Sequence, residues 1–183
     1  MPEIADCLAR NHRRYQFAPV WSEGLSGRGA RDFAVHRSDG RITGCLALWD
    51  QSRARQAVIR GYHPRIAALR PALNLLGRVT GLPHLPRPGQ PLRQVYLSLM
   101  AVDGDDPTVL VELVKRGLAE AAHRGFDLAL IGLADSNPML PMLRRSFRAR
   151  EYRSLLYLVH WEDGRDAVES LGQRPLHVEA GLL

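Results

Sequence analysis

Three polar side chains stand where they could contact a substrate or move a proton. Asp50 follows an apolar segment that ends at Trp49, at what should be an open edge of a sheet. Tyr96 and Ser98 alternate along a second apolar segment and should share a face with Met100, because alternate residues of a strand point the same way. Each has a plainer alternative: Asp50 as an exposed loop acid, and the other two as half-buried packing residues.

An acidic loop precedes a helix that we expect at about 107–123. The loop reads DGDDP at 103–107, and Asp followed by Pro is a common helix start because Asp caps free N–H groups and Pro fits the first turn. The N–H groups of Thr108 and Val109 could instead bind an anion at this helix end. The sequence leaves open whether the loop is an anion site or only a helix cap.

Asn137 stands where the next helix, expected at 137–147, should begin. We expect its side chain to cap that helix, and it is also a candidate for contacting a bound cofactor. Other site chemistries find little support. The seven histidines lack metal-ligand spacing, so we expect no metal site. No G-x-S-x-G motif is present, which argues against a hydrolase.

The composition is that of one globular domain over 1–183, with 45% apolar and 24% charged residues. The two cysteines, Cys7 and Cys45, form no CxxC motif, which favours a reduced, cytoplasmic protein. No apolar run approaches the roughly 20 residues of a membrane helix, and no secretory signal is evident. The net charge is +6, but the arginines are dispersed and Lys115 is the only lysine, so we do not expect nucleic-acid binding.

The periodicity predicts a mixed α/β (α+β) order in which one βαβ unit is flanked by antiparallel strands. The Asp39-Gly40 pair predicts a hairpin turn between two of the strands. The expected helices span 3–16, 63–79, 107–123, 137–147 and 166–171. The expected strands span 32–36, 41–49, 94–102, 127–133, 152–161 and 177–183, with a further strand suggested at 56–62. A proline-rich connector at 82–91 closes an insert of about 61–94.

This order resembles the GNAT superfamily of acyl-CoA N-acyltransferases, over nearly the whole chain. The clearest parts are the hairpin at 33–49 (FAV…DGRITGCLALW), the central strand at 96–102 (YLSLMAV), and the stretch at 126–152 (FDLALIGLADSNPML…EY). The resemblance implies a mixed central sheet with flanking helices, in which the central strand splays from its parallel neighbour. The first of these should be 94–102 and the second 127–133.

The resemblance also implies a cofactor, acetyl-CoA or another acyl-CoA, held in that splay. It implies contacts from the exposed backbone of the central strand, from the next helix N-terminus and from the helix asparagine: Leu99, Met100, Ala101, Val102, Thr108, Val109 and Asn137. The implied activity is transfer of an acyl group to the amine of a small molecule or peptide, with Asp50, Tyr96 or Ser98 as catalytic candidates.

The chain departs from the family pattern at three places. Glycines that bring backbone N–H groups to a diphosphate are reduced to Gly104, among three aspartates that would oppose phosphate charge. Members often carry a tyrosine seven residues after the helix asparagine, where this chain has Arg144. The insert at 61–94 is long for the family. These departures support an alternative: a non-catalytic binding or interaction domain that has lost its phosphate loop, as half of a tandem pair or in a homodimer.

The helix of the insert carries leucines among arginines, including Leu69, Leu73 and Leu76. We expect it to pack against the body near the acceptor side and to limit substrate access there.

Overall fold

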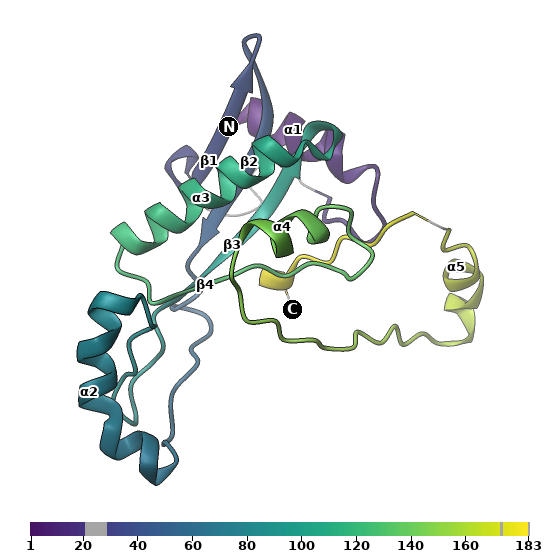
Figure 1. Ribbon diagram of the computed structural model, residues 1–183. Coiled ribbons are helices and arrows are strands. Elements are labelled where there is room, and N and C mark those ends of the chain that lie inside the picture. The colour runs from purple at the N-terminus through teal and green to yellow at the C-terminus, as the bar shows by residue number, and fades with distance from the viewer. Residues whose placement is uncertain (21–28, 173, 183) are drawn as a thin grey trace.

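The computed structural model describes residues 1–20, 29–172 and 174–182 (Figure 1). Within these residues a mixed sheet has the strand order β1-β2-β3-β4. The strands are β1 (Phe33–Ser38), β2 (Arg41–Trp49), β3 (Gln94–Val102) and β4 (Leu128–Leu130). The helices are α1 (Pro2–His12), α2 (Pro64–Thr80), α3 (Pro107–His123), α4 (Leu140–Ser146) and α5 (Arg165–Glu169). The expected α/β class with a mixed central sheet is confirmed.

The hairpin of β1 and β2 forms as the sequence predicts. Ser38 pairs with Arg41 across the turn, and Asp39 and Gly40 have φ angles of 49° and 76°. Two adjacent positive φ values define the hairpin turn whose twist matches that of paired strands, and Asp and Gly tolerate them best. The antiparallel pairing then continues from β2 to β3, so β3 lies inside the sheet.

Helices α3 and α1 cover opposite faces of the sheet, and each face has its own apolar core. Under α3 the core includes Leu97, Leu110 and Leu113. Under α1 it includes Cys7, Cys45 and Leu99. Helix α3 begins where the Asp-Pro signal predicts, because Asp106 caps it and Pro107 occupies its first position. Because the apolar face of α3 packs on the sheet, the helix leads the chain back along the sheet from the end of β3 to the start of β4.

Strands β3 and β4 are parallel neighbours joined through α3, as predicted. Their pairing covers Gln94↔Leu128, Val95↔Ala129 and Tyr96↔Leu130. Beyond Tyr96 the remaining six residues of β3 have no β4 partner, and β4 ends at Leu130 rather than at 133. Strands β3 and β4 thus separate after a short paired stretch. This separation is the splay implied by the family resemblance.

Two expected C-terminal strands are corrected by the structure. Residues 152–161 are extended but pair with none of the described strands, and they run outward to α5 at the right of Figure 1. Their apolar side chains are exposed, for example Leu155 at 79% and Trp161 at 75%. A strand is also expected at 177–183, but 177–179 pair with no described strand, 180–182 form a 3-10 turn and 183 lies outside the described residues. An isolated bridge joins Leu176, just before this range, to Gln16. Apolar alternation in both segments suits a strand, but strand formation also needs a partner edge that the local sequence cannot specify.

The insert forms a small unit of its own. Helix α2 packs on the proline-rich segment that follows it: Asn74 exchanges two hydrogen bonds with the backbone of Leu85, and the Tyr62 hydroxyl donates to the Pro86 carbonyl. The expected strand at 56–62 is reduced to the bridge Val58↔Pro91. The helix projects away from the sheet (Figure 1), so the expectation that it packs against the body is wrong. Prolines at 83, 86, 88 and 91 give an extended segment that α2 can use as a surface.

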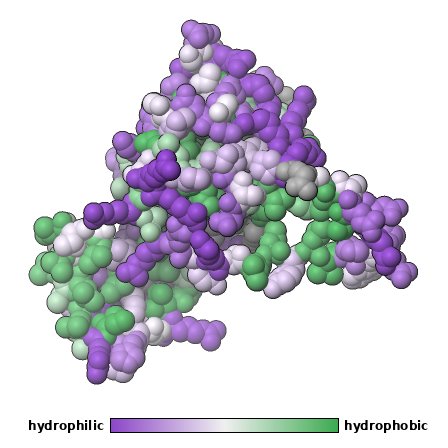
Figure 2. All heavy atoms as spheres, turned by 45° about the vertical axis from the view of Figure 1, so that its right-hand side comes forward, coloured by the Kyte–Doolittle hydropathy of each residue, from purple (hydrophilic) through white to green (hydrophobic). Residues whose placement is uncertain are grey.

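Apolar side chains gather on two exposed regions in Figure 2: the insert at the lower left and the outlying strip near α5 at the right. The insert contributes Ile66, Leu69, Leu75, Leu76, Val79 and Leu82. No helix in the parts of the chain described here is both long and apolar enough to cross a bilayer.

The packing of α3 on the sheet predicts an unequal response to two truncations on one helix. Leu113 is fully buried and Leu118 is 38% exposed. Leu113→Ala should lower the free energy of unfolding by about 3 kcal/mol because it leaves a cavity under the sheet, whereas Leu118→Ala should cost less than about 1 kcal/mol. Urea denaturation of both variants measures the difference, and equal losses would contradict this account of the core.

Candidate functional site

Strand β3 carries one extra residue opposite β2, directly at the start of the splay. Cys45 and Ala47 pair with Ala101 and Ser98, so two steps along β2 match three steps along β3. Leu99 adopts a φ of 51°, a left-handed conformation that costs a non-glycine residue on the order of 1 kcal/mol. This is a β-bulge, a feature that re-aims side chains and ends regular pairing.

The bulge reverses which face each later residue of β3 presents. Val95 and Leu97 belong to the core under α3, and after the bulge Met100 joins the same core. Leu99 instead belongs to the core under α1. The expectation that Tyr96 and Ser98 share a face with Met100 is therefore wrong, because strict alternation fails where one residue is inserted.

The bulge also frees a backbone donor that the C-terminal segment takes up. The N–H of Leu99 donates to Oε2 of Glu179 at 2.8 Å, and the Ser98 hydroxyl donates to Oε1 at 2.8 Å. The N–H of Gly181 donates to Oε1 at 3.3 Å. Glu179 is only 8% exposed, so this carboxylate is a buried charge held by hydrogen bonds.

The segment around Glu179 lies wedged between β3, the end of β2 and the chain that follows β4. A Cβ atom on Gly132 would overlap the Ala180 side chain, and one on Gly181 would lie 2.6 Å from the Trp49 ring. The side-chain amide of Gln51 donates to the Gly181 carbonyl. Glycine at 132 and at 181 is therefore what lets this segment fill the space between the separating strands.

The end of α1 covers the rest of this part of β3. Arg14 donates to the Val102 carbonyl at 3.2 Å, and the rings of His12 and His177 stack with centroids 4.5 Å apart. Burial lowers the pKa of His12 to about 4, with the neighbouring His177 acting in the same direction against opposing hydrogen bonds to the backbone of Met100 and Pro19 and the charge of Glu179. Burial likewise lowers the pKa of His177, whose two ring nitrogens have no hydrogen-bond partner among the residues that the structure describes. Both imidazoles are therefore neutral at pH 7.

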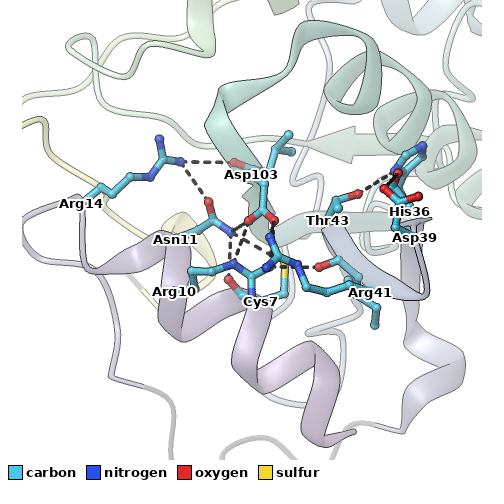
Figure 3. Close-up of polar contacts among 12 residues, drawn as sticks. Cys7, Arg10, Asn11, Arg14, His36, Asp39, Arg41, Thr43 and Asp103 are labelled. Carbon is cyan, nitrogen blue, oxygen red and sulfur yellow. Dashed lines mark hydrogen bonds and ion pairs between the residues drawn. The ribbon is translucent and has the colours of Figure 1, made fainter.

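The acidic loop is neutralised by arginines, which revises the expected repulsion of phosphates. Asp103 accepts hydrogen bonds from Arg10, Asn11 and Arg41 (Figure 3). Burial alone would raise the pKa of Asp103, but the hydrogen bonds from these partners outweigh it and the pKa is lowered. Asp105 accepts two hydrogen bonds from Arg14, each 2.8 Å long. The negative charges of Asp103 and Asp105 are thus compensated by arginines that lie far away in the sequence, in or next to α1 and in β2.

The N-terminus of α3 is capped by its own loop. Oδ1 of Asp106 accepts the N–H groups of Thr108 and Val109 at 2.7 and 3.3 Å. These are the two donors that the sequence offered to an anion. In this structure the helix-cap alternative holds, and an anion would have to displace Asp106 to reach them.

Asn137 is 2% exposed and carries an unsatisfied donor. Its Oδ1 accepts the N–H of Met139 at 2.9 Å, while its Nδ2 has no partner in the described part of the chain. Helix α4 begins only at Leu140, so the expected role as helix cap is replaced by a turn before the helix. Arg144, which stands at the position of the family tyrosine, is tied to Glu151 by two 2.9 Å hydrogen bonds.

Asp50 and Tyr96 come together in one cavity of about 270 Å³ at the start of β3, where β3 is still paired with β4. The base of the insert and the start of β3 line it, and Arg55, Arg93 and Arg124 are among its lining residues. Arg124 is ion-paired with Asp32 and Glu120. Asp50 is exposed and accepts the N–H of Ser52 at 2.9 Å. Ser98 lies elsewhere, buried against Glu179, so the three catalytic candidates separate into a pocket pair and a buried residue.

Sequence reasoning missed Glu179, His12 and His177. Glu179 is a lone acid in an apolar segment, which is a usable signal, but its partner Leu99 lies 80 positions away. The histidines were considered only for metal spacing. In the residues that the structure covers, no three His, Cys, Asp or Glu side chains gather as a metal site would require.

Comparison with known proteins adds little. No family model matches the chain, and no curated protein matches it. Among solved structures, the chain is similar to an aminoglycoside acetyltransferase from an uncultured soil metagenomic sample, in complex with trehalose. The identity is 11%, the match covers 88% of each chain, and the TM-score is 0.45. A likeness at this level carries no weight for fold or function.

The buried histidine pair makes stability depend on pH. The folded chain keeps His12 neutral down to about pH 4, whereas the unfolded chain takes up a proton below about pH 6.5. The free energy of unfolding should therefore fall as the pH drops from 7 to 4, by up to roughly 3 kcal/mol from His12. His12→Gln should flatten this slope and the exposed His63→Gln should not, as measured by urea denaturation across this pH range. An unchanged slope in His12→Gln would refute the assignment.

Proposed function

We propose that this chain binds an acyl-CoA in the splay of β3 and β4 and transfers the acyl group to an amine. The observation that carries the proposal is the coincidence of two features of β3. The strand loses its β4 partner after Tyr96, and its bulge turns the Leu99 N–H out of the ladder and toward the splay. A backbone donor that lies outside the ladder, at a gap between parallel strands, can hold and polarise a thioester carbonyl.

Several residues support the binding of the rest of the donor. The backbone from Leu99 to Val102 can pair with the amide groups of a pantetheine arm, and Asn137 offers a buried Nδ2 donor that has no partner in the described part of the chain. An unsatisfied buried donor is costly, so a ligand acceptor there would be stabilising. The N–H groups of Thr108 and Val109 could take a phosphate if Asp106 withdraws.

The acceptor amine would enter through the cavity that contains Asp50 and Tyr96. Attack on the carbonyl carbon forms the N–C bond and breaks the C–S bond, the thiolate leaves, and the ammonium proton passes to a base or through water. Asp50 is the pocket carboxylate that could receive it. Arg55 and Arg93 at the pocket favour acceptors, small molecules or peptides, that carry acidic or neutral groups next to the amine.

A second candidate function is a non-catalytic binding or interaction domain, alone as a homodimer or beside a tandem partner. The observation that favours it is the capped α3 N-terminus, because Asp106 already satisfies both donors that a diphosphate would use. The two candidates differ in one measurable property, which is affinity for the acyl donor.

Calorimetric titration of acetyl-CoA distinguishes them. We expect wild type to bind weakly, with a dissociation constant in the micromolar range at best. Asp106→Gly should bind about tenfold more tightly, because a charge that opposes the phosphates is removed and the N–H donors are released, while glycine remains an acceptable cap. Asp39→Asn, in the distant β1–β2 turn, is the matched control and should behave as wild type.

Release of free thiol in the presence of a panel of amines would then establish catalysis. Binding without turnover on any amine would favour the interaction domain. No binding by wild type or by Asp106→Gly would refute the acyl-CoA proposal.

A further inference from the structure

The carboxylate of Glu179 lies where the proposed acyl donor needs to be. Its Oε2 accepts the Leu99 N–H at 2.8 Å, the donor that should polarise a thioester carbonyl. A carboxylate oxygen and a carbonyl oxygen make the same kind of acceptor for this N–H, but the carboxylate is charged and so binds more strongly. The two cannot occupy the donor together.

The buried position of Glu179 shows that the site around the bulge suits such a group. Three donors converge on the carboxylate, from Ser98, Leu99 and Gly181. The Glu179 residue is only 8% exposed. The first two come from consecutive residues of the rigid central strand. The third comes from the same segment as Glu179 itself and would leave with it.

The segment that carries Glu179 can move without breaking the sheet. Its backbone-to-backbone hydrogen bonds to the body form a single bridge, in which the Gln16 N–H donates to the Pro175 carbonyl and the Gln16 carbonyl accepts from the His177 N–H. Its other attachments involve side chains, such as the Ser136 hydroxyl that accepts from the Leu176 N–H at 3.3 Å and the Gln51 amide that donates to the Gly181 carbonyl. Upstream of it in the chain lie the short helix α5 and the exposed stretch 148–161, which pairs with none of the described strands. Buried His177, whose ring nitrogens find no hydrogen-bond partner among the described residues, weakens the attachment of the segment further.

We propose that the segment 174–182 is an internal competitor of the acyl donor: Glu179 fills the acyl-oxygen site on β3, and the segment must withdraw before a donor binds. This inference rests on the proposed function for the identity of the donor. The site itself consists of two hydrogen-bond donors, on Ser98 and Leu99, that bind a carboxylate. It does not depend on the identity of the acyl donor.

The first test uses acetate as a stand-in for the removed carboxylate. Glu179→Ala in the full chain should unfold at a lower temperature than wild type, because it leaves the Leu99 N–H buried and unpaired. Sodium acetate should raise the unfolding temperature of Glu179→Ala more than that of wild type or of the exposed control Glu169→Ala. Equal acetate effects on all three proteins would overturn the site.

The second test asks whether the segment competes with the donor. Glu179→Gln keeps the shape and one acceptor oxygen, so it guards against a variant that fails to fold. Acetyl-CoA should bind Glu179→Gln more tightly than wild type, by about tenfold, since a charge-assisted hydrogen bond has become a neutral one. Equal affinities of wild type and Glu179→Gln would overturn the competition.

The two tests also separate this inference from the proposed function. If acetate stabilises Glu179→Ala selectively but neither variant binds acetyl-CoA, the carboxylate site stands and the acyl-CoA proposal falls. If acetyl-CoA binds wild type and both variants equally, the acyl-CoA proposal stands and the internal competitor falls.

Discussion

The extra residue in β3 at Ser98 and Leu99 is the constraint on which the rest of this structure depends. Its positive φ is tolerated because both sides of it are fixed: β2 pairs with β3 before and after the bulge, and cores on both faces hold the neighbouring side chains. The strain is thus borne by two well-packed layers. What it produces is a backbone N–H directed away from the ladder, at the place where β4 leaves.

The residues that pack into the splay make hydrogen bonds to that donor or to the β3 edge beyond it. Glu179 takes the N–H of Leu99, and Arg14 takes the carbonyl of Val102. The ion pairs of Asp103 and Asp105 anchor α1 across the end of β3, which brings His12 over the same edge. The arginines that looked dispersed in the sequence are here part of a local balance of charge, and their exposed pairs order the loop more than they stabilise the fold.

The sequence predicted what local patterns encode and failed where distant contacts decide. The Asp-Gly turn, the Asp-Pro start of α3 and the amphipathic stripe of α3 each act within a few residues, and each was predicted correctly. The expected strands at 152–161 and 177–183 failed because a strand needs an edge to pair with. Two of the catalytic candidates, Asp50 and Tyr96, do share a pocket. Ser98 was expected to share a face of β3 with Met100, but the bulge falls between them and puts them on different faces.

The charge on the acidic loop and the position of Glu179 could not be read from spacing. Asp103 and its partner Arg10 are 93 positions apart, and Glu179 and Ser98 are 81 apart. The most direct test of the central role of the bulge is the amide resonance of Leu99 in labelled full-length protein during addition of acetyl-CoA. The account predicts that this resonance shifts together with those of residues 176–182 as the segment leaves. A Leu99 resonance that stays fixed while the donor binds elsewhere would contradict it.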